Sequence, residues 1–171
     1  MSYASPRLGD PISSAELHTI EAIARAEIAT AFDRFDVVLS DNRHARYHVR
    51  VVQRLVDQRF RHREMSVAGE SRGAAGFGGS GAVSFQYVAD GAMVFAPDTA
   101  SRAEVMAAIG RGAGRVAIHE FLHHLLPKFP IHDSRDTHSY EGNSPAMMEG
   151  YFNVLHWGIA EPVLEKRVGR R

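Results

Sequence analysis

The chain contains no cysteine among its 171 residues. This absence excludes disulfide bonds, thiolate zinc sites and cysteine nucleophiles, so any zinc ion would need His, Asp, Glu or water as ligands. Long apolar runs are also absent, because no segment approaches the ~20 apolar residues that span a bilayer. Residues 1–10 are polar and lack the apolar core of a signal peptide. We expect a soluble protein, cytoplasmic as given, with secretion by a non-classical bacterial route left open.

An excess of charge of either sign is missing as well. The 20 Lys and Arg residues balance the 20 Asp and Glu residues, so the formal net charge is zero. Neither nucleic acid nor an anionic membrane is therefore expected as a partner. A local basic patch is interpreted as a solvated face; it consists of Arg59, Arg61, Arg63 and Arg72. Residues 1–12 are interpreted as a flexible arm, and the length and the ordinary apolar content of 44% predict a single domain over residues 13–171.

The motif that implies chemistry is His119-Glu120-Phe121-Leu122-His123, an HExxH sequence. Positions i and i+4 of a helix lie on one face, so His119 and His123 can direct two imidazoles to the same metal ion. Two neutral nitrogen ligands suit Zn²⁺, and Glu120 starts beside the first ligand, where it can reach a water on the metal. Apolar residues surround the motif, which is typical of a buried active-site helix. The motif predicts a zinc site with Glu120 as general base.

A catalytic zinc site needs a third protein ligand and one open position. We expect Glu149 to be this ligand, because it lies in a helix that Ser144 and Pro145 would begin as N-cap and first-turn residues. Asn153 lies four residues further on the same helix face, where it could hydrogen-bond a ligand histidine. A helical element would hold the Glu149 carboxylate rigidly against the HExxH helix.

An HExxH motif followed by a Glu on the next helix resembles the gluzincin metallopeptidases, the group that includes thermolysin and the zinc aminopeptidases. The segment Met148-Glu149-Gly150-Tyr151-Phe152 is similar to the aminopeptidase motif Asn-Glu-Gly-Phe-Ala, which carries the third zinc ligand. The resemblance implies an α+β, zincin-like fold. In that fold a small mixed or antiparallel sheet packs on the HExxH active-site helix, and a second helix bears the third ligand.

His132 is a second candidate for the third zinc ligand. The pair His132-Asp133 is similar to the end of the long metzincin motif, and Met147 or Met148 could then lie beneath the metal. The spacing differs from that motif, because His132 follows His123 by nine residues and no Gly lies between them. The remaining candidates for the third ligand are Asp133, Asp136, His138 and Glu141.

Capping boxes and hydrophobic spacing predict the other elements. The capping box of Ser13 and Glu16 predicts the beginning of an amphipathic helix over residues 14–34. A second capping box, of Ser101 and Glu104, predicts a helix over residues 102–126. Glycines at 110, 112 and 114 would either break that second helix or permit close packing. Strands are expected at 37–39, 47–51, 83–87 and 92–95, with a helical segment within 53–68 and a helix from 144 to about 157. The glycine-rich residues 69–82 are expected to form a flexible surface loop, with a flap that covers the substrate as the alternative.

These expectations lead to a zinc-dependent peptidase that acts on a peptide or protein substrate. Glu120 would take a proton from a zinc-bound water and pass it to the leaving amine. Tyr140 is expected to stabilise the oxyanion, with His138 and His156 as alternatives. The strand that ends near Phe95 is expected to pair with an extended peptide.

Two other functions stay open. The first is a secreted bacterial effector or toxin that uses the same metalloprotease chemistry and is controlled by a cognate inhibitor. The second is a non-catalytic, zinc-stabilised binding domain, in which His132 or His138 would complete the coordination sphere.

Overall fold

The structure, a computed structural model, describes residues 8–42, 44–57, 65–73, 78–131, 135–142 and 149–171. Over these ranges the chain forms five helices and five strands, as expected for an α+β fold with a small mixed sheet. In chain order the elements are α1 (Ser14–Ala31), β1 (Tyr47–Val52), β2 (Val56–Asp57), β3 (Met65–Ser66), β4 (Gly69–Gly73), β5 (Gly79–Ser84), α2 (Phe85–Phe95), α3 (Arg102–Leu125), α4 (Glu149–Phe152) and α5 (Glu161–Val168).

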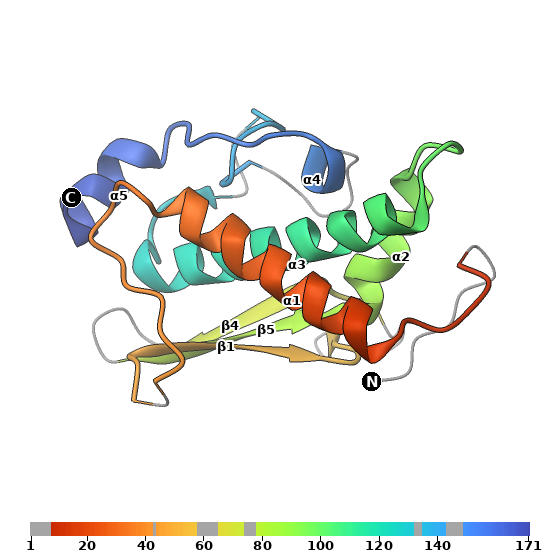
Figure 1. The fold of residues 1–171 in the computed structure, drawn as a ribbon. Coiled ribbons are helices and arrows are strands. Elements are labelled where there is room, and N and C mark those ends of the chain that lie inside the picture. The colour runs from red at the N-terminus through yellow and green to blue at the C-terminus, as the bar shows by residue number, and fades with distance from the viewer. Residues whose placement is uncertain (1–7, 43, 58–64, 74–77, 132–134, 143–148) are drawn as a thin grey trace.

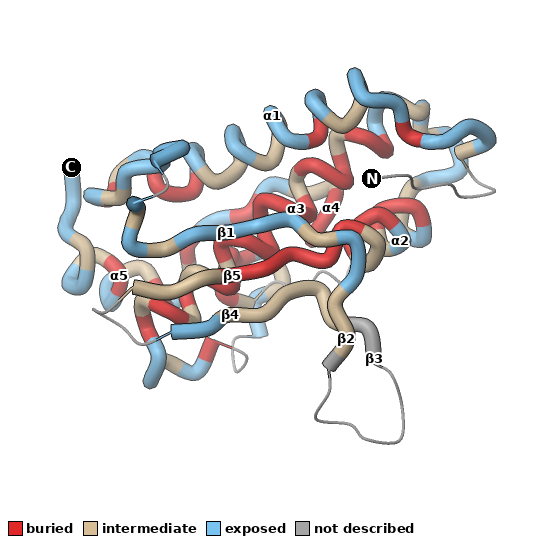
Figure 2. Tube along the Cα trace, turned by 90° about the horizontal axis from the view of Figure 1, so that it is seen from below, coloured by how far each residue is buried: buried red, intermediate tan, exposed pale blue. Residues whose placement is uncertain are grey.

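The main sheet has three strands in the order β1-β5-β4. β1 runs parallel to β5, with Tyr47 opposite Gly79, and β4 runs antiparallel to β5, with Gly69 opposite Val83. A separate antiparallel pair joins β2 to β3. Within the described ranges β1 and β4 are the two edges of the main sheet. Figure 2 shows that β5, between them, is buried over much of its length while β1 is largely exposed.

Two long helices lie alongside each other on one face of this sheet, and α4 lies on the side of α3 away from the sheet (Figure 1). Both long helices begin at the expected capping boxes, at Ser13 for α1 and at Ser101 for α3. The glycines of α3 permit close packing, and the helix continues through them without a break. A Cβ atom at Gly110 would lie 2.7 Å from Cβ of Ile23, and one at Gly114 would lie 2.7 Å from the carbonyl oxygen of Ala24.

The buried apolar residues form two clusters that follow each other along α3. One cluster joins α1, α2, β5 and the first half of α3, and it includes Tyr151 of α4. The other joins the C-terminal ends of α1 and α3 to the segment that precedes α5, around Phe35 and Trp157. The indole N–H of Trp157 donates to the carbonyl oxygen of Ala31 at 2.6 Å, which ties this segment to the end of α1. None of the helices in the described ranges is long and apolar enough to cross a membrane.

Several local predictions were wrong. Residues 37–39 do not form a buried strand, because Val38 is 75% exposed in an irregular segment after α1. Residues 85–95 form helix α2 where two strands were expected, so no strand ends near Phe95. The expected loop over residues 69–82 contributes strands β4 and β5, apart from residues 74–77, which lie outside the described ranges.

Two further predictions need correction. The described parts of residues 53–68 contain the short strands β2 and β3 and no helix. The helix expected to run from 144 to about 157 ends at Phe152 as α4, because the chain from Asn153 onward is irregular. Its expected beginning at Ser144 and Pro145 lies outside the described residues.

Candidate metal centre

The two histidines of the HExxH motif lie on successive turns of α3. Their Nε2 atoms are 3.1 Å apart, and their rings are nearly perpendicular at 87°. Two imidazoles that bind one tetrahedral zinc ion at ~2.0–2.1 Å place their nitrogen atoms about 3.3 Å from each other. His119 and His123 therefore fit as two ligands of a single ion.

Glu120, the residue after the first histidine, lies between α3 and the edge strand β4. It is only 7% exposed, and Gly69 of β4 comes so close that a Cβ atom there would lie 2.5 Å from Oε1 of Glu120. Burial, reinforced by the nearby carboxylate of Glu70, raises the pKa of Glu120 from its ordinary value of 4.5 to about 7. A carboxyl group with this pKa can accept and release a proton near neutral pH.

The sheet approaches α3 closely because three of its residues that face the helix have no side chain. We call Gly69, Gly79 and Gly81 the glycine face of the sheet. A Cβ atom at Gly79 would lie 2.8 Å from Nδ1 of His124, and one at Gly81 would lie 2.6 Å from the hydroxyl oxygen of Tyr47. These distances are shorter than normal van der Waals contact, so a larger residue at Gly69 or Gly79 would push against α3, and one at Gly81 would displace the Tyr47 ring.

Tyr47, at the beginning of β1, is a residue of this site that the sequence analysis assigned only to a strand. Its ring packs on Phe121 and His124, with ring centroids 5.0 and 4.7 Å away, and its hydroxyl is 3.1 Å from Oγ of Ser71 on β4. Burial raises the pKa of Tyr47 to about 12, and the charge of Glu120 acts in the same direction. The position of Tyr47 depends on the pairing of β1 with β5, which no local sequence pattern reveals.

His124 follows the HExxH motif but faces the sheet, four residues after Glu120 on the same side of α3. It is 7% exposed, and burial lowers its pKa, with the positive charge of Arg167 as a smaller cause. Its Nδ1 atom is buried and has no hydrogen-bond partner among the described residues. His124 is thus a neutral, buried imidazole beside the glycine face, distinct from the pair of candidate ligands.

The described residues do not show a third ligand. No group of three His, Asp or Glu side chains among them could hold a metal ion. His132 and Asp133 lie outside the described residues, as does the side chain of Glu149. The backbone of Glu149 begins α4. The identity of the third ligand therefore stays a prediction.

The backbone of α4 is held firmly against α3. Nε of Arg111 donates to the carbonyl oxygen of Tyr151, and an Nη atom of Arg115 donates to that of Asn153, each at 2.7 Å. The fully buried ring of Tyr151 fills the space above Gly112, where a Cβ atom would lie 2.6 Å from Cε1 of the ring. These contacts fix α4 beside the part of α3 that precedes His119.

The other candidates for the third ligand have polar partners in the structure. Glu141 is 1% exposed and accepts hydrogen bonds from the backbone N–H groups of Gly158 and Ala160. Asp136 accepts from the backbone N–H of His138, which lowers its pKa. These bonds organise the loop before α5.

Two histidines of this loop were considered for the oxyanion. Nε2 of His156 lies 2.9 Å from Oδ2 of Asp136, and Nε2 of His138 lies 3.2 Å from Nδ2 of Asn153. Both histidines are exposed. Asn153 thus contacts His138, which is itself a candidate for the third ligand.

Tyr140, the expected oxyanion stabiliser, lies in a buried network between α1 and α3. Its hydroxyl donates to Oε1 of Glu27 at 3.4 Å, and the same oxygen accepts from Nε of Arg115 at 2.7 Å. The Tyr140 ring packs on Trp157, with centroids 5.0 Å apart. Burial, followed by the charge of Glu27, raises the pKa of Tyr140 to about 12.

Comparison of the chain with protein-family models, curated protein sequences and solved structures finds no match. A functional assignment therefore rests on the residues of the site and on their geometry.

Proposed function

We propose that the protein is a zinc-dependent peptidase with a zincin-like arrangement of helix and sheet. His119 and His123 are two of its zinc ligands, Glu149 is the third, and Glu120 is the general base. The observation that carries the proposal is the 3.1 Å separation of the two Nε2 atoms on the helix that also buries Glu120. Glutamate at this position has no role in a purely structural zinc site.

The chemistry divides between the metal and Glu120. When bound, zinc lowers the pKa of a coordinated water toward ~7 and polarises the substrate carbonyl. Glu120 accepts the proton of the attacking water and delivers it to the leaving amine. A group performs both transfers best when its pKa is near the working pH. Burial raises the pKa of Glu120 to about 7 without a metal ion, and the charge of a bound zinc ion would lower this pKa again.

The edge strand β4 replaces the region near Phe95 as the proposed docking strand for the substrate. Glu120 lies directly beneath Gly69 of β4. A peptide that pairs with the outer edge of β4 would pass beside the general base. Tyr140 stays a prediction as oxyanion stabiliser, and its hydrogen bond to Glu27 supports a structural role for it instead.

Metal content is the first test of this proposal. Elemental analysis of the purified protein should give one zinc per wild-type chain and none in His119→Gln or His123→Gln. His18→Gln is the matched control, because His18 is exposed on α1 and should leave the zinc in place. Loss of zinc in Glu149→Ala but not in His132→Ala would support the proposed ligand set. Absence of zinc from the wild type after metal reconstitution would refute the assignment.

The role of Glu120 is tested by hydrolysis of a peptide library. Glu120→Gln should keep the zinc and the far-ultraviolet circular dichroism spectrum of the wild type but lose hydrolysis, by at least about a hundredfold. Glu104→Gln is the control, because Glu104 belongs to the capping box of the same helix and Gln can replace Glu there. Full activity of Glu120→Gln would contradict the mechanism. Bound zinc without any hydrolysis by the wild type would favour a zinc-stabilised binding domain.

A further inference from the structure

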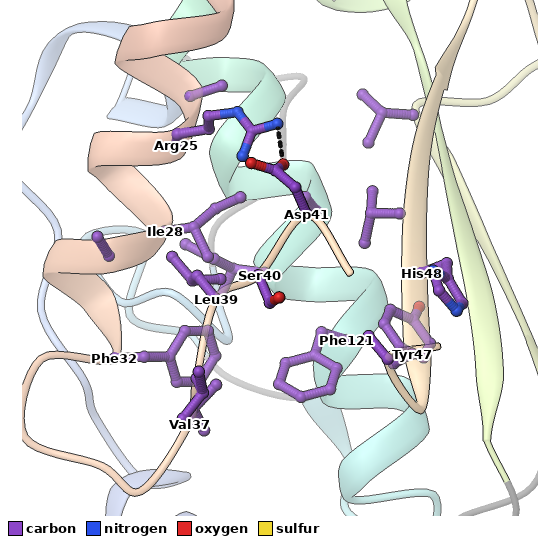
Figure 3. Close-up of a pocket in the computed structure, with 18 of the residues that line it drawn as sticks. Arg25, Ile28, Phe32, Val37, Leu39, Ser40, Asp41, Tyr47, His48 and Phe121 are labelled. Carbon is purple, nitrogen blue, oxygen red and sulfur yellow. Dashed lines mark ion pairs between the residues drawn. The ribbon is translucent and has the colours of Figure 1, made fainter. Parts of the chain in front are cut away.

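A groove lies between α1 and β1 and has a cavity volume of about 1470 Å³. Figure 3 shows α1 on one side, β1 on the other and Phe121 of α3 at the bottom. At its mouth Arg25 of α1 pairs with Asp41 at 2.7 Å. The lining is mostly apolar and includes Leu17, Ile20, Ile28, Leu39, Val49 and Val51.

The backbone of β1 offers hydrogen-bonding groups on the side of this groove. The carbonyl oxygen of Arg46 accepts from the N–H of Gly79 on β5, so residue 46 directs its backbone groups toward β5. The N–H and C=O groups of a strand residue point to the same side, and those of the next residue point to the other side. The backbone groups of Tyr47, Val49 and Val51 therefore point away from β5, along an edge that has no strand partner in the described ranges.

The same three residues also line the groove. Val49 is 40% exposed and Val51 is 46% exposed, although both belong to a strand whose neighbour β5 is mostly buried. On the opposite wall, Leu17, Ile20 and Ile28 follow helical spacing along α1. An additional strand beside β1 would form hydrogen bonds with the outward backbone groups of β1 and would cover the apolar side chains of both β1 and α1.

We propose that this groove binds an extended segment of a partner protein, which adds to the edge of β1 as a fourth strand. Residues of the partner segment that face the groove are apolar, because they meet Val49, Val51 and the apolar stripe of α1. Residues that face the other side are acidic, because Arg50, which alternates with Val49 and Val51 along β1, is exposed and does not line the groove. The partner segment thus alternates apolar and acidic residues.

A second copy of this chain is a poorer occupant than a partner of this kind. If two β1 strands paired with each other, Arg50 of one copy would find no carboxylate on the other, because β1 contains no Asp or Glu. The groove shares Tyr47 and Phe121 with the surroundings of the candidate metal centre, but its hydrogen-bonding edge is a different one. It uses the β1 edge, whereas Glu120 lies beneath β4 at the opposite edge of the sheet.

The backbone part of the proposal is tested with a synthetic peptide of alternating Val and Glu residues, capped at both ends. Isothermal titration calorimetry on the full chain should detect binding to the wild type. Val49→Pro should weaken it by at least about tenfold, because proline removes the outward N–H, and proline is tolerated on an edge that faces solvent. Val49→Ala, the matched control, shortens the side chain but keeps the N–H and should weaken binding by less than about threefold.

The charge part is tested with a variant that leaves the β1–β5 hydrogen bonds intact. Arg50→Glu should weaken binding of the Val–Glu peptide by roughly fivefold or more and should strengthen binding of a Val–Lys peptide. Lys166→Glu, an exposed change on α5, should alter neither affinity. This charge exchange decides the question even if Val49→Pro does not fold.

Three results would overturn the proposal. The first is no binding of the Val–Glu peptide to the wild type. The second is equal affinity of the Val49→Pro and Val49→Ala proteins for that peptide. The third is concentration-dependent self-association of the wild type that Val49→Pro abolishes, since this would assign the groove to a second copy of the chain.

Discussion

The buried ion pair between Glu27 of α1 and Arg115 of α3 makes a quantitative prediction about stability. Nε of Arg115 donates to Oε1 of Glu27 at 2.7 Å, and the two side chains are only 5% exposed for Arg115 and 14% exposed for Glu27. Tyr140 and the carbonyl of Asn153 also belong to the network. Removal of one partner leaves the other as an uncompensated buried charge.

The magnitude follows from this burial. Arg115→Met or Glu27→Leu alone should lower the free energy of unfolding by about 3–5 kcal/mol, because each leaves a buried charge without its partner. The double variant removes both charges, so its loss should be less than the sum of the two single losses by at least about 2 kcal/mol. An ordinary domain has about 5–15 kcal/mol of stability, so these losses are measurable.

Urea unfolding followed by circular dichroism measures the free energy of unfolding of the wild type, the two single variants and the double variant. Glu21 and Arg25 of α1 are the matched control pair, at 3.0 Å but with side chains that are 59% and 55% exposed. Their coupling should be only about 0.3–0.5 kcal/mol. Additive losses at Glu27 and Arg115, or a coupling no larger than that of the exposed pair, would refute the argument that burial strengthens this interaction.

Two other predictions concern the packing of α4 and the titration of the proposed base. Gly112→Ala should lower the free energy of unfolding by about 1–3 kcal/mol, because the new Cβ atom would lie 2.6 Å from the ring of the fully buried Tyr151; urea unfolding measures this loss. Glu120 holds its proton more tightly in the folded state, where its pKa is about 7, than at its ordinary value of 4.5. The metal-free wild type should therefore lose stability as the pH rises from about 4.5 to about 7, by up to about 3 kcal/mol. Unfolding of Glu120→Gln in chelator over this pH range should lack this loss, and an equal loss in both proteins would contradict the assignment.

The long helices could be predicted from the sequence because their signals are local. The capping boxes at Ser13 and Ser101 contain both the side-chain acceptor and the glutamate that returns a hydrogen bond, and both helices begin there. The HExxH motif likewise fixed the relation of His119, Glu120 and His123, since helical periodicity alone brings the two histidines together.

Helix α2 shows where local patterns mislead. The alternation of Val83, Phe85 and Tyr87 is typical of a strand, but β5 ends at Ser84, whose side chain accepts from the N–H of Tyr87 and begins the helix. The buried residues of α2 then follow helical spacing, at positions 85, 88, 89, 92 and 93. A pattern that extends across the boundary of two elements has no single period.

The sheet-facing part of the candidate site could not be predicted for a different reason. Glycine disfavours strands, so residues 69–82 have the composition of a loop, and only the close approach of α3 explains why strands form there. The burial of Glu120 and the position of Tyr47 both depend on this packing between distant segments. The motif predicts Glu120 as the base, whereas tertiary structure determines the pKa of this residue.

The glycine face of the sheet also bears on the order in which the molecule assembles. Glycine loses more backbone freedom on folding than any other residue and contributes no side chain to offset that loss. We therefore expect the hairpin of β4 and β5 to form stably after α3 has docked, whereas α1 and α3 pack together through Gly110 and Gly114 without it. The strand that lies over Glu120 should be among the last parts to order during folding and among the first to open in the native state. The surroundings of the proposed base would then be the least protected part of the main sheet, although the helix that carries it is among the most protected.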